Sequence, residues 1–148
     1  MQPRLNWKQA APDAYKALLG LRQYLEASGL DARLRLLVEL RASQINGCVY
    51  CVDLHANEAR AAGETQQRLD CLCVWRETAF FDARERAALA WTEALTRVAE
   101  TGAPDAAYAE ARAQFDDKTL ADLTLAISAM NAWNRIGVGF RMQPSVRR

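Results

Sequence analysis

The stretch DARLRLLVELRASQINGCVYCVDLHANEARAAG, residues 31–63, decides the fold. Gly47 divides this stretch and Gly63 ends it, and glycine is common just after the last residue of a helix. Its first half repeats apolar residues at the intervals of an amphipathic helix, namely Leu34, Leu37, Val38, Leu40 and Ile45. We therefore expect two consecutive helices, over residues 31–46 and about 48–62.

Helical signals continue on both sides of this stretch. No segment shows the apolar–polar alternation of a half-buried strand, and no repeat or linker divides the chain. Apolar periodicity with capping or stop signals predicts further helices over about residues 12–28, 65–75, 82–101, 104–115 and 116–140. The predicted N-cap residues are Asp31, Asp82 in a capping box, and Asp116 or Asp117. The predicted fold class is all-α, a single-domain bundle of six or seven helices over residues 1–148.

Composition limits the classes of partner. The chain has 19 basic and 18 acidic residues and a net charge of +1. This balance argues against a nucleic-acid partner or an acidic membrane surface, since both require a basic excess. No run approaches the roughly 20 apolar residues of a membrane span, and the first residues lack a secretory signal. We expect a cytoplasmic protein with reduced thiols.

Three residues with redox chemistry follow the glycine that ends the first helix: Cys48, Cys51 and His55. Positions i, i+3 and i+7 lie within an arc of about 60° on a helix, so these side chains share one face. Unpaired N–H groups and the dipole at a helix start favour a thiolate, and thiols at this spacing can form a disulfide. His55, the only histidine, can accept and return a thiol proton. The pattern predicts a dithiol–disulfide redox centre.

Two other interpretations of the cysteines stay open. The pair could be inert core packing, or Cys48, Cys51 and His55 could bind zinc with Cys71 or Cys73 as the fourth ligand. Cys71 and Cys73 lie two residues apart, on opposite faces of a predicted helix, and cannot readily bridge each other. We expect both to be core or interface residues.

Other polar residues could assist the thiols. Glu39 lies nine residues before Cys48 on the preceding helix, where it would be either a proton relay or a surface carboxylate. Asn131, Asn134 and Arg135 interrupt an apolar helix, and such amides are often buried and tie helices together. Large apolar residues that suit either core packing or subunit contacts are Trp7, Trp75, Phe80, Phe81 and Trp91.

The segment ELRASQINGCVYC, residues 39–51, followed by His55, resembles the alkylhydroperoxidase D-like branch of the carboxymuconolactone decarboxylase family. The similarity continues through EARAAG at 58–63, ERAALAW at 85–91 and NAWNR at 131–135. It covers about residues 31–141, which leaves residues 1–10 and 142–148 peripheral.

The resemblance implies an all-α homo-oligomer, a trimer or hexamer, with peroxidase activity. By this resemblance Cys51 attacks an organic hydroperoxide and becomes a sulfenic acid, and Cys48 condenses with it to a disulfide. A dithiol donor, such as a lipoamide-bearing protein, then regenerates the pair. The expected catalytic residues are Cys51, Cys48, His55 and Glu39, with no metal or cofactor.

The chain departs from the family pattern at two positions. The well-described enzymes place the assisting Glu twelve residues before the first Cys, where this chain has Leu36, and a His between the cysteines, where it has Tyr50. Glu39 lies one turn nearer and is the candidate substitute. The helix-start position favours Cys48 as the lower-pKa thiol, whereas nearness to His55 favours Cys51.

Two other functions compete with the peroxidase. One is decarboxylase-like chemistry on a cyclic lactone acid, as in the family branch that does not depend on a cysteine pair. The other is a redox-sensing oligomer in which the disulfide changes assembly without turnover.

Overall fold

A computed structural model describes residues 1–146, and within this range the chain forms helices and connecting loops without a strand. The helices follow the sequence in this order: α1 (Trp7–Ala10), α2 (Pro12–Ala27), α3 (Ala32–Asn46), α4 (Val49–Ala61), α5 (Gln66–Cys71), the 3₁₀ helix η1 (Leu72–Glu77), α6 (Ala83–Thr96), α7 (Val98–Thr101), α8 (Asp105–Gln114) and α9 (Asp117–Gly139). The predicted all-α fold is confirmed.

Side chains cap the longer helices as the sequence predicts. The Asp31 carboxylate accepts the Leu34 N–H at 2.8 Å, and Asp116 accepts the Thr119 N–H at 2.7 Å. Asp82 begins α6 with a complete capping box. Each such bond satisfies a backbone donor that the helix itself leaves unpaired, so these residues fix where α3, α9 and α6 begin.

The short helices differ from the prediction. The seven predicted segments correspond to α2, α3, α4, the α5–η1 pair, α6 with α7, α8 and α9, while α1 lies outside all of them. Both α1 and α7 have four residues, which is too short for an apolar repeat to register. The last two residues of the predicted peripheral tail, Arg147 and Arg148, lie outside the described residues. Among the described helices, none combines the length and the apolar character needed to cross a membrane.

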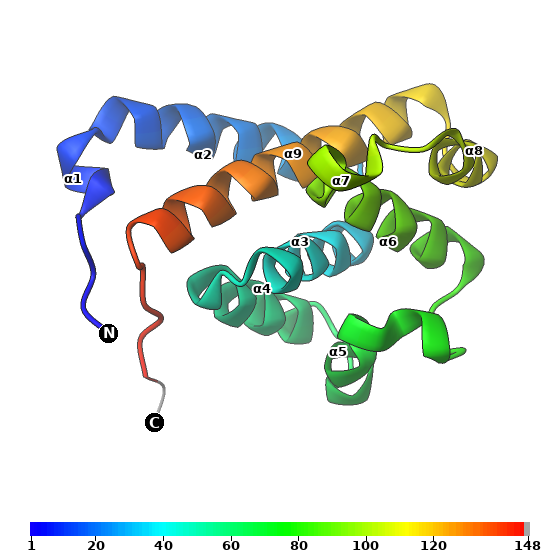
Figure 1. Ribbon diagram of the computed structural model, residues 1–148, viewed down its shortest axis with the longest axis horizontal. Coiled ribbons are helices and arrows are strands. Elements are labelled where there is room, and N and C mark those ends of the chain that lie inside the picture. Colours follow the sequence, from blue (N-terminus) through cyan, green and yellow to red (C-terminus); the bar gives the residue numbers. More distant parts are fainter. Residues whose placement is uncertain (147–148) are drawn as a thin grey trace.

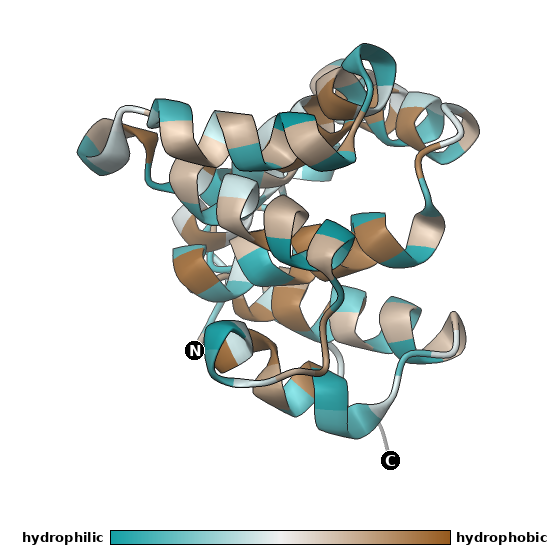
Figure 2. Cartoon of the chain, turned by 90° about the vertical axis from the view of Figure 1, so that its right-hand side faces the viewer, coloured by the Kyte–Doolittle hydropathy of each residue, from teal (hydrophilic) through white to brown (hydrophobic). Residues whose placement is uncertain are grey.

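Helix α3 lies at the centre of the bundle. It packs against α4, α6 and α9, while α2 covers α9 from the other side (Figure 1). Many of the most apolar residues lie on helices in the middle of the stack (Figure 2). The largest fully buried apolar side chains are Leu37, Leu40, Leu72, Leu89, Leu123 and Ile127. Because burying one such side chain stabilises the fold by roughly 1.5–3 kcal/mol, this core holds α3, η1, α6 and the first half of α9 together.

Most of the large aromatic residues considered for subunit contacts belong to the core of the chain itself. Trp7, Trp75, Phe81 and Trp91 are buried, whereas Phe80 is 40% exposed. Core packing is therefore the role of the first four.

The N-terminal segment, expected to be peripheral, lies against the end of α9. The Arg4 N–H donates to the Phe140 carbonyl at 2.9 Å. Trp7 packs edge-on against Tyr15 of α2 and Trp133 of α9, with ring centroids 5.3 and 5.6 Å apart. This aromatic cluster joins α1, α2 and α9 above the start of α4.

Candidate redox site

The site begins at the sharp turn between α3 and α4. Gly47 ends α3 with φ at +67°, a left-handed conformation that favours glycine, and Cys48 is the N-cap of α4. The Cys48 Sγ accepts the Cys51 N–H with an N–S distance of 3.4 Å, and the two sulfur atoms lie 2.7 Å apart. Both thiols are free and buried. The predicted pairing of two thiols at a helix start is therefore present in the fold.

The two thiols differ in acidity. A hydrogen bond from the Cys51 thiol, together with the backbone N–H of the same residue, outweighs burial and lowers the pKa of Cys48 to about 6. Donation to Cys48 and burial raise the pKa of Cys51. Of the two thiols, Cys48 therefore has the lower pKa, as its helix-start position favours.

Helix α9 covers the sulfurs at Gly137. A Cβ atom at this position would lie 2.6 Å from the Cys48 Sγ and 3.7 Å from the Cys51 Sγ. A side chain there would collide with the pair, so the glycine permits the close approach of α9. The role of Gly137 could not be predicted from the sequence, because it depends on how α9 packs against the start of α4.

The amides of α9 join it to α3. Asn134 is fully buried, donates to the Ser43 hydroxyl at 3.0 Å and accepts from Asn46 at 2.9 Å. Asn46 also donates to Asn131 at 3.0 Å. The Asn134 amide additionally lowers the pKa of Cys48 by hydrogen bonding. The expected structural role of Asn131 and Asn134 matches these contacts, whereas Arg135 is exposed and bonds within its own helix.

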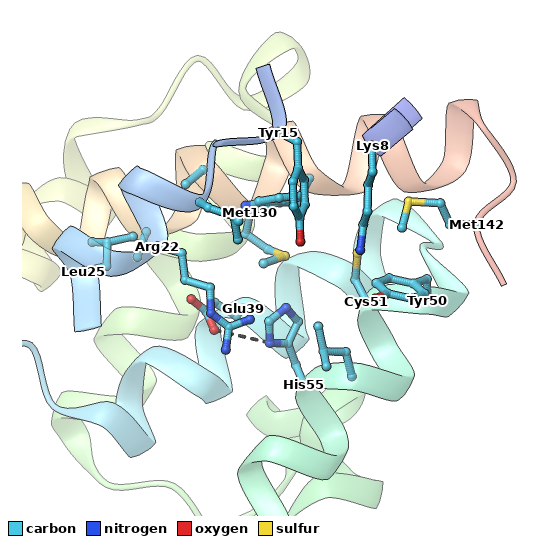
Figure 3. A pocket seen from close by; sticks show the side chains of 15 residues that line it. Lys8, Tyr15, Arg22, Leu25, Glu39, Tyr50, Cys51, His55, Met130 and Met142 are labelled. Carbon is cyan, nitrogen blue, oxygen red and sulfur yellow. Dashed lines mark ion pairs between the residues drawn. The ribbon is translucent and has the colours of Figure 1, made fainter. Parts of the chain in front are cut away.

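His55 lies between two carboxylates. Its Nδ1 is 3.1 Å from a Glu58 oxygen and 3.3 Å from a Glu39 oxygen, and the ring is 3% exposed. Figure 3 shows the ring on α4 with Nδ1 turned to Glu39 and its other nitrogen facing the cavity. The two carboxylates at Nδ1 fix the orientation of the ring.

Glu39 is a buried carboxylate and not a surface one. Its side chain is 6% exposed, and Arg35 donates to both of its oxygens at 2.8 and 3.0 Å. The structure thus brings Glu39 to His55, one helix away, although its part in proton transfer stays a prediction.

Glu58 is a contact of His55 that the sequence reasoning missed. Partial burial alone would raise its pKa, but hydrogen bonds from His55 and Arg22 lower the pKa of Glu58 to about 2. Arg22 of α2 donates to Glu58 at 2.7 Å. The i, i+3 spacing from His55 to Glu58 was the available signal, whereas nothing local connects Arg22, 36 residues earlier, to this site.

The arrangement does not gather the predicted zinc ligands. Within the described residues, the set of His, Cys, Asp and Glu side chains close enough to share one ion is Glu39, His55 and Glu58. Arg35 and Arg22 already pair with the two carboxylates, which reduces the negative charge that a cation would meet there.

A cavity gives access to one of the two thiols. Cys51, His55 and Glu39 line it, and Cys48 does not. Its apolar walls come from α2, α4 and α9 and include Leu19, Leu25, Leu54, Ala126, Ala129, Met130 and Trp133. The cavity lies under α1 and α2 (Figure 3). Cys51 is therefore the thiol that a molecule in the cavity would meet.

The second cysteine pair lies elsewhere. Cys71, at the end of α5, is half-buried, and Cys73, in η1, is exposed. The core prediction is wrong for Cys73, because η1 turns that side chain outward; an interface role for it stays a prediction.

Known proteins resemble the chain along most of its length. The profile of the carboxymuconolactone decarboxylase family matches residues 12–94. YdfG of Bacillus subtilis (strain 168), an uncharacterized protein, is 36% identical over 138 residues, which cover 93% of this chain and 94% of YdfG. The chain belongs to the carboxymuconolactone decarboxylase family.

Solved structures identify the branch. The crystal structure of ATU0492 from Agrobacterium tumefaciens, a protein of unknown function considered a candidate AhpD antioxidant defence protein, has 46% identity and a TM-score of 0.97, covering 99% of this chain and 100% of that one. An uncharacterized peroxidase-related protein from Silicibacter sp. TM1040 has 26% identity and a TM-score of 0.78, covering 88% and 70%. The chain lies in the AhpD-like branch, as the sequence predicts.

Proposed function

We propose that the protein is a thiol peroxidase that reduces organic hydroperoxides through Cys51 and Cys48. One observation carries the proposal: Cys51 lines an apolar cavity beside His55 while its sulfur lies 2.7 Å from that of Cys48. A thiol that meets both a substrate cavity and a resolving thiol has what a two-cysteine peroxidase needs.

The first step consumes the hydroperoxide. The Cys51 proton moves along its hydrogen bond to the Cys48 thiolate, which leaves the negative charge on the thiol that faces the cavity. The Cys51 thiolate attacks the terminal peroxide oxygen, the O–O bond breaks, and the electron pair leaves as an alkoxide. Protonated His55, held by Glu39 and Glu58, gives the alkoxide its proton. The products are an alcohol and the Cys51 sulfenic acid.

The second step closes the disulfide. Cys48 attacks the Cys51 sulfur, and hydroxide leaves and takes the Cys48 proton through His55 to become water. The sulfurs need little movement, because they already lie 2.7 Å apart. A dithiol donor then reduces the disulfide and is itself oxidised. We propose a lipoamide-bearing protein as this donor, and a cytoplasmic trimer or hexamer as the working form.

The test follows both steps in single turnover. Reduced protein is mixed with cumene hydroperoxide in a stopped-flow instrument, and loss of thiol is measured. Cys48→Ser is expected to accumulate a sulfenic acid on Cys51, detected by dimedone labelling and mass spectrometry, whereas Cys51→Ser is expected not to react.

Thiol loss no faster than in buffer would contradict the proposal, as would dimedone labelling of Cys48 in Cys51→Ser. Decarboxylation of a lactone acid that survives removal of both cysteines would favour the other family branch. A change of oligomer mass on oxidation, seen by light scattering without turnover, would favour a redox sensor.

A further inference from the structure

Two cationic side chains line the cavity beside Cys51, and one of them has no counter-ion within the described part of the chain. Arg22 lines it but is paired with Glu26 and Glu58, at 2.8 and 2.7 Å. Lys8 of α1 also lines the cavity, and among residues 1–146 no carboxylate lies within ion-pairing distance of its ammonium group. The positive charge of Lys8 is therefore available to a molecule in the cavity.

The surroundings hold Lys8 over the cavity. Its Nζ lies 4.9 Å from the centre of the Tyr15 ring, and the neighbouring Trp7 is buried against Tyr15 and Trp133. In Figure 3 the Lys8 side chain extends from α1 toward the side of the cavity that carries Tyr50 and Cys51. The contact with the ring face orients the ammonium group without neutralising it.

The rest of the cavity has mostly apolar walls, which favour a ligand with a large apolar group. Leucine, alanine, methionine and tryptophan side chains form most of its walls. Glu39, the carboxylate that lines it, is held by Arg35 and faces His55. A ligand that fits this distribution combines an apolar group with one negative charge.

We propose that Lys8 binds the carboxylate of the substrate, so that the substrate class is organic hydroperoxides that carry a carboxylate on an apolar body. This inference rests on the proposed function, because it takes Cys51 as the sulfur that the peroxide meets. A carboxylate gains a charge-assisted hydrogen bond from the ammonium group, whereas a neutral ester offers only an uncharged acceptor and a weaker hydrogen bond. Lys8 is in this sense a specificity-determining residue.

Binding is tested first, with ligands that cannot react. Isothermal titration calorimetry compares 4-isopropylbenzoate with its methyl ester, which has the same apolar body and no charge. We expect the reduced protein to bind the acid about tenfold more tightly than the ester. Lys8→Met, which keeps an unbranched apolar stem, is expected to remove this preference, and Lys8→Arg to retain it.

Lys16→Met is the matched control. Lys16 is an exposed lysine of α2 whose ammonium group pairs with Asp13, and it does not line the cavity. This variant should keep the preference for the acid. No binding of the acid, equal binding of acid and ester, or a preference that survives in Lys8→Met would overturn the inference.

Kinetics then separate this inference from the proposed function. Cumene hydroperoxide with a para carboxylate is compared with its methyl ester, and we expect a kcat/KM ratio of about ten that falls to about one in Lys8→Met. If both peroxides oxidise the thiols at equal rates, the peroxidase function stands and the role of Lys8 fails. If the benzoate binds through Lys8 but neither peroxide reacts, the binding site stands and the peroxidase function fails.

Discussion

The chain contains two closely spaced cysteine pairs with different surroundings. Cys48 and Cys51 are buried at the start of α4, with their sulfurs in contact under Gly137 of α9. Cys71 and Cys73 lie where α5 passes into η1, and one of them is exposed. Neither residue of the second pair lines the cavity or meets His55.

The difference comes from position on the helix. A spacing of three residues puts two side chains on one face, and the N-cap position adds a backbone N–H that points at the first sulfur. A spacing of two separates the side chains, and the end of a helix offers carbonyl oxygens instead: the Cys73 sulfur contacts the Asp70 carbonyl at 3.7 Å. Local backbone geometry therefore decides which pair brings its two sulfur atoms together.

The largest contrast concerns turnover. Replacing Cys51 or Cys48 by Ser should lower steady-state reduction of cumene hydroperoxide by at least about a thousandfold, because each removes a bond-forming sulfur. Cys71→Ser and Cys73→Ser should change it by less than about twofold. A coupled assay with a dithiol donor measures all four variants. A large loss of activity in Cys73→Ser would show that the second cysteine pair also takes part in the reaction.

The contact with α9 gives the next largest effect. Gly137→Ala should destabilise the fold by roughly 1–3 kcal/mol, because the added Cβ overlaps the Cys48 sulfur. Gly139→Ala is the matched control in the same helix, since nothing lies within 4 Å of a Cβ at Gly139. Urea unfolding of the reduced proteins measures the difference, and equal stabilities would show that α9 does not press on the pair.

A smaller effect is expected at the carboxylate that sequence reasoning missed. Glu58→Gln should slow Cys51 oxidation by about tenfold, because His55 loses one of the two carboxylates that hold its Nδ1 and orient the ring. Glu26→Gln also removes an ion pair of Arg22 but does not touch His55. An equal loss of rate in the two variants would assign Glu58 a structural role only.

The smallest effect is on the titration of the thiols. Absorbance of the thiolate at 240 nm should rise with a midpoint near pH 6, and Cys48→Ser should abolish this phase. Because the folded pKa of Cys48 lies below the unfolded value, the thiolate stabilises the fold. That contribution is complete above about pH 9 and is lost as the pH falls through 6. A first midpoint above pH 8 would contradict the assignment of the thiolate to Cys48.

The sequence predicted the local parts of this structure well. Helix periods, the caps at Asp31 and Asp82, and the shared face of Cys48, Cys51 and His55 all depend on residues within two helical turns of each other. These features need no knowledge of packing. They can therefore be predicted correctly even when the arrangement of the helices is not known.

The parts that sequence reasoning missed are contacts between distant segments. Gly137 lies against Cys48, Arg22 reaches Glu58, and Lys8 lines the cavity only because α1, α2, α4 and α9 converge. Glu39 was a candidate because of its position before Cys48 in the sequence. The sequence could not show whether its side chain is buried, because that depends on the antiparallel packing of α3 and α4.

The aromatic cluster of Trp7, Tyr15 and Trp133 has an optical consequence. Trp133 packs against the buried group that contains Cys48 and Cys51, and Trp7 lies edge-on to it. A disulfide quenches indole emission at short range far more strongly than a pair of thiols does. The chain should therefore become dimmer on oxidation and brighter on reduction, and report its own redox state without any added label.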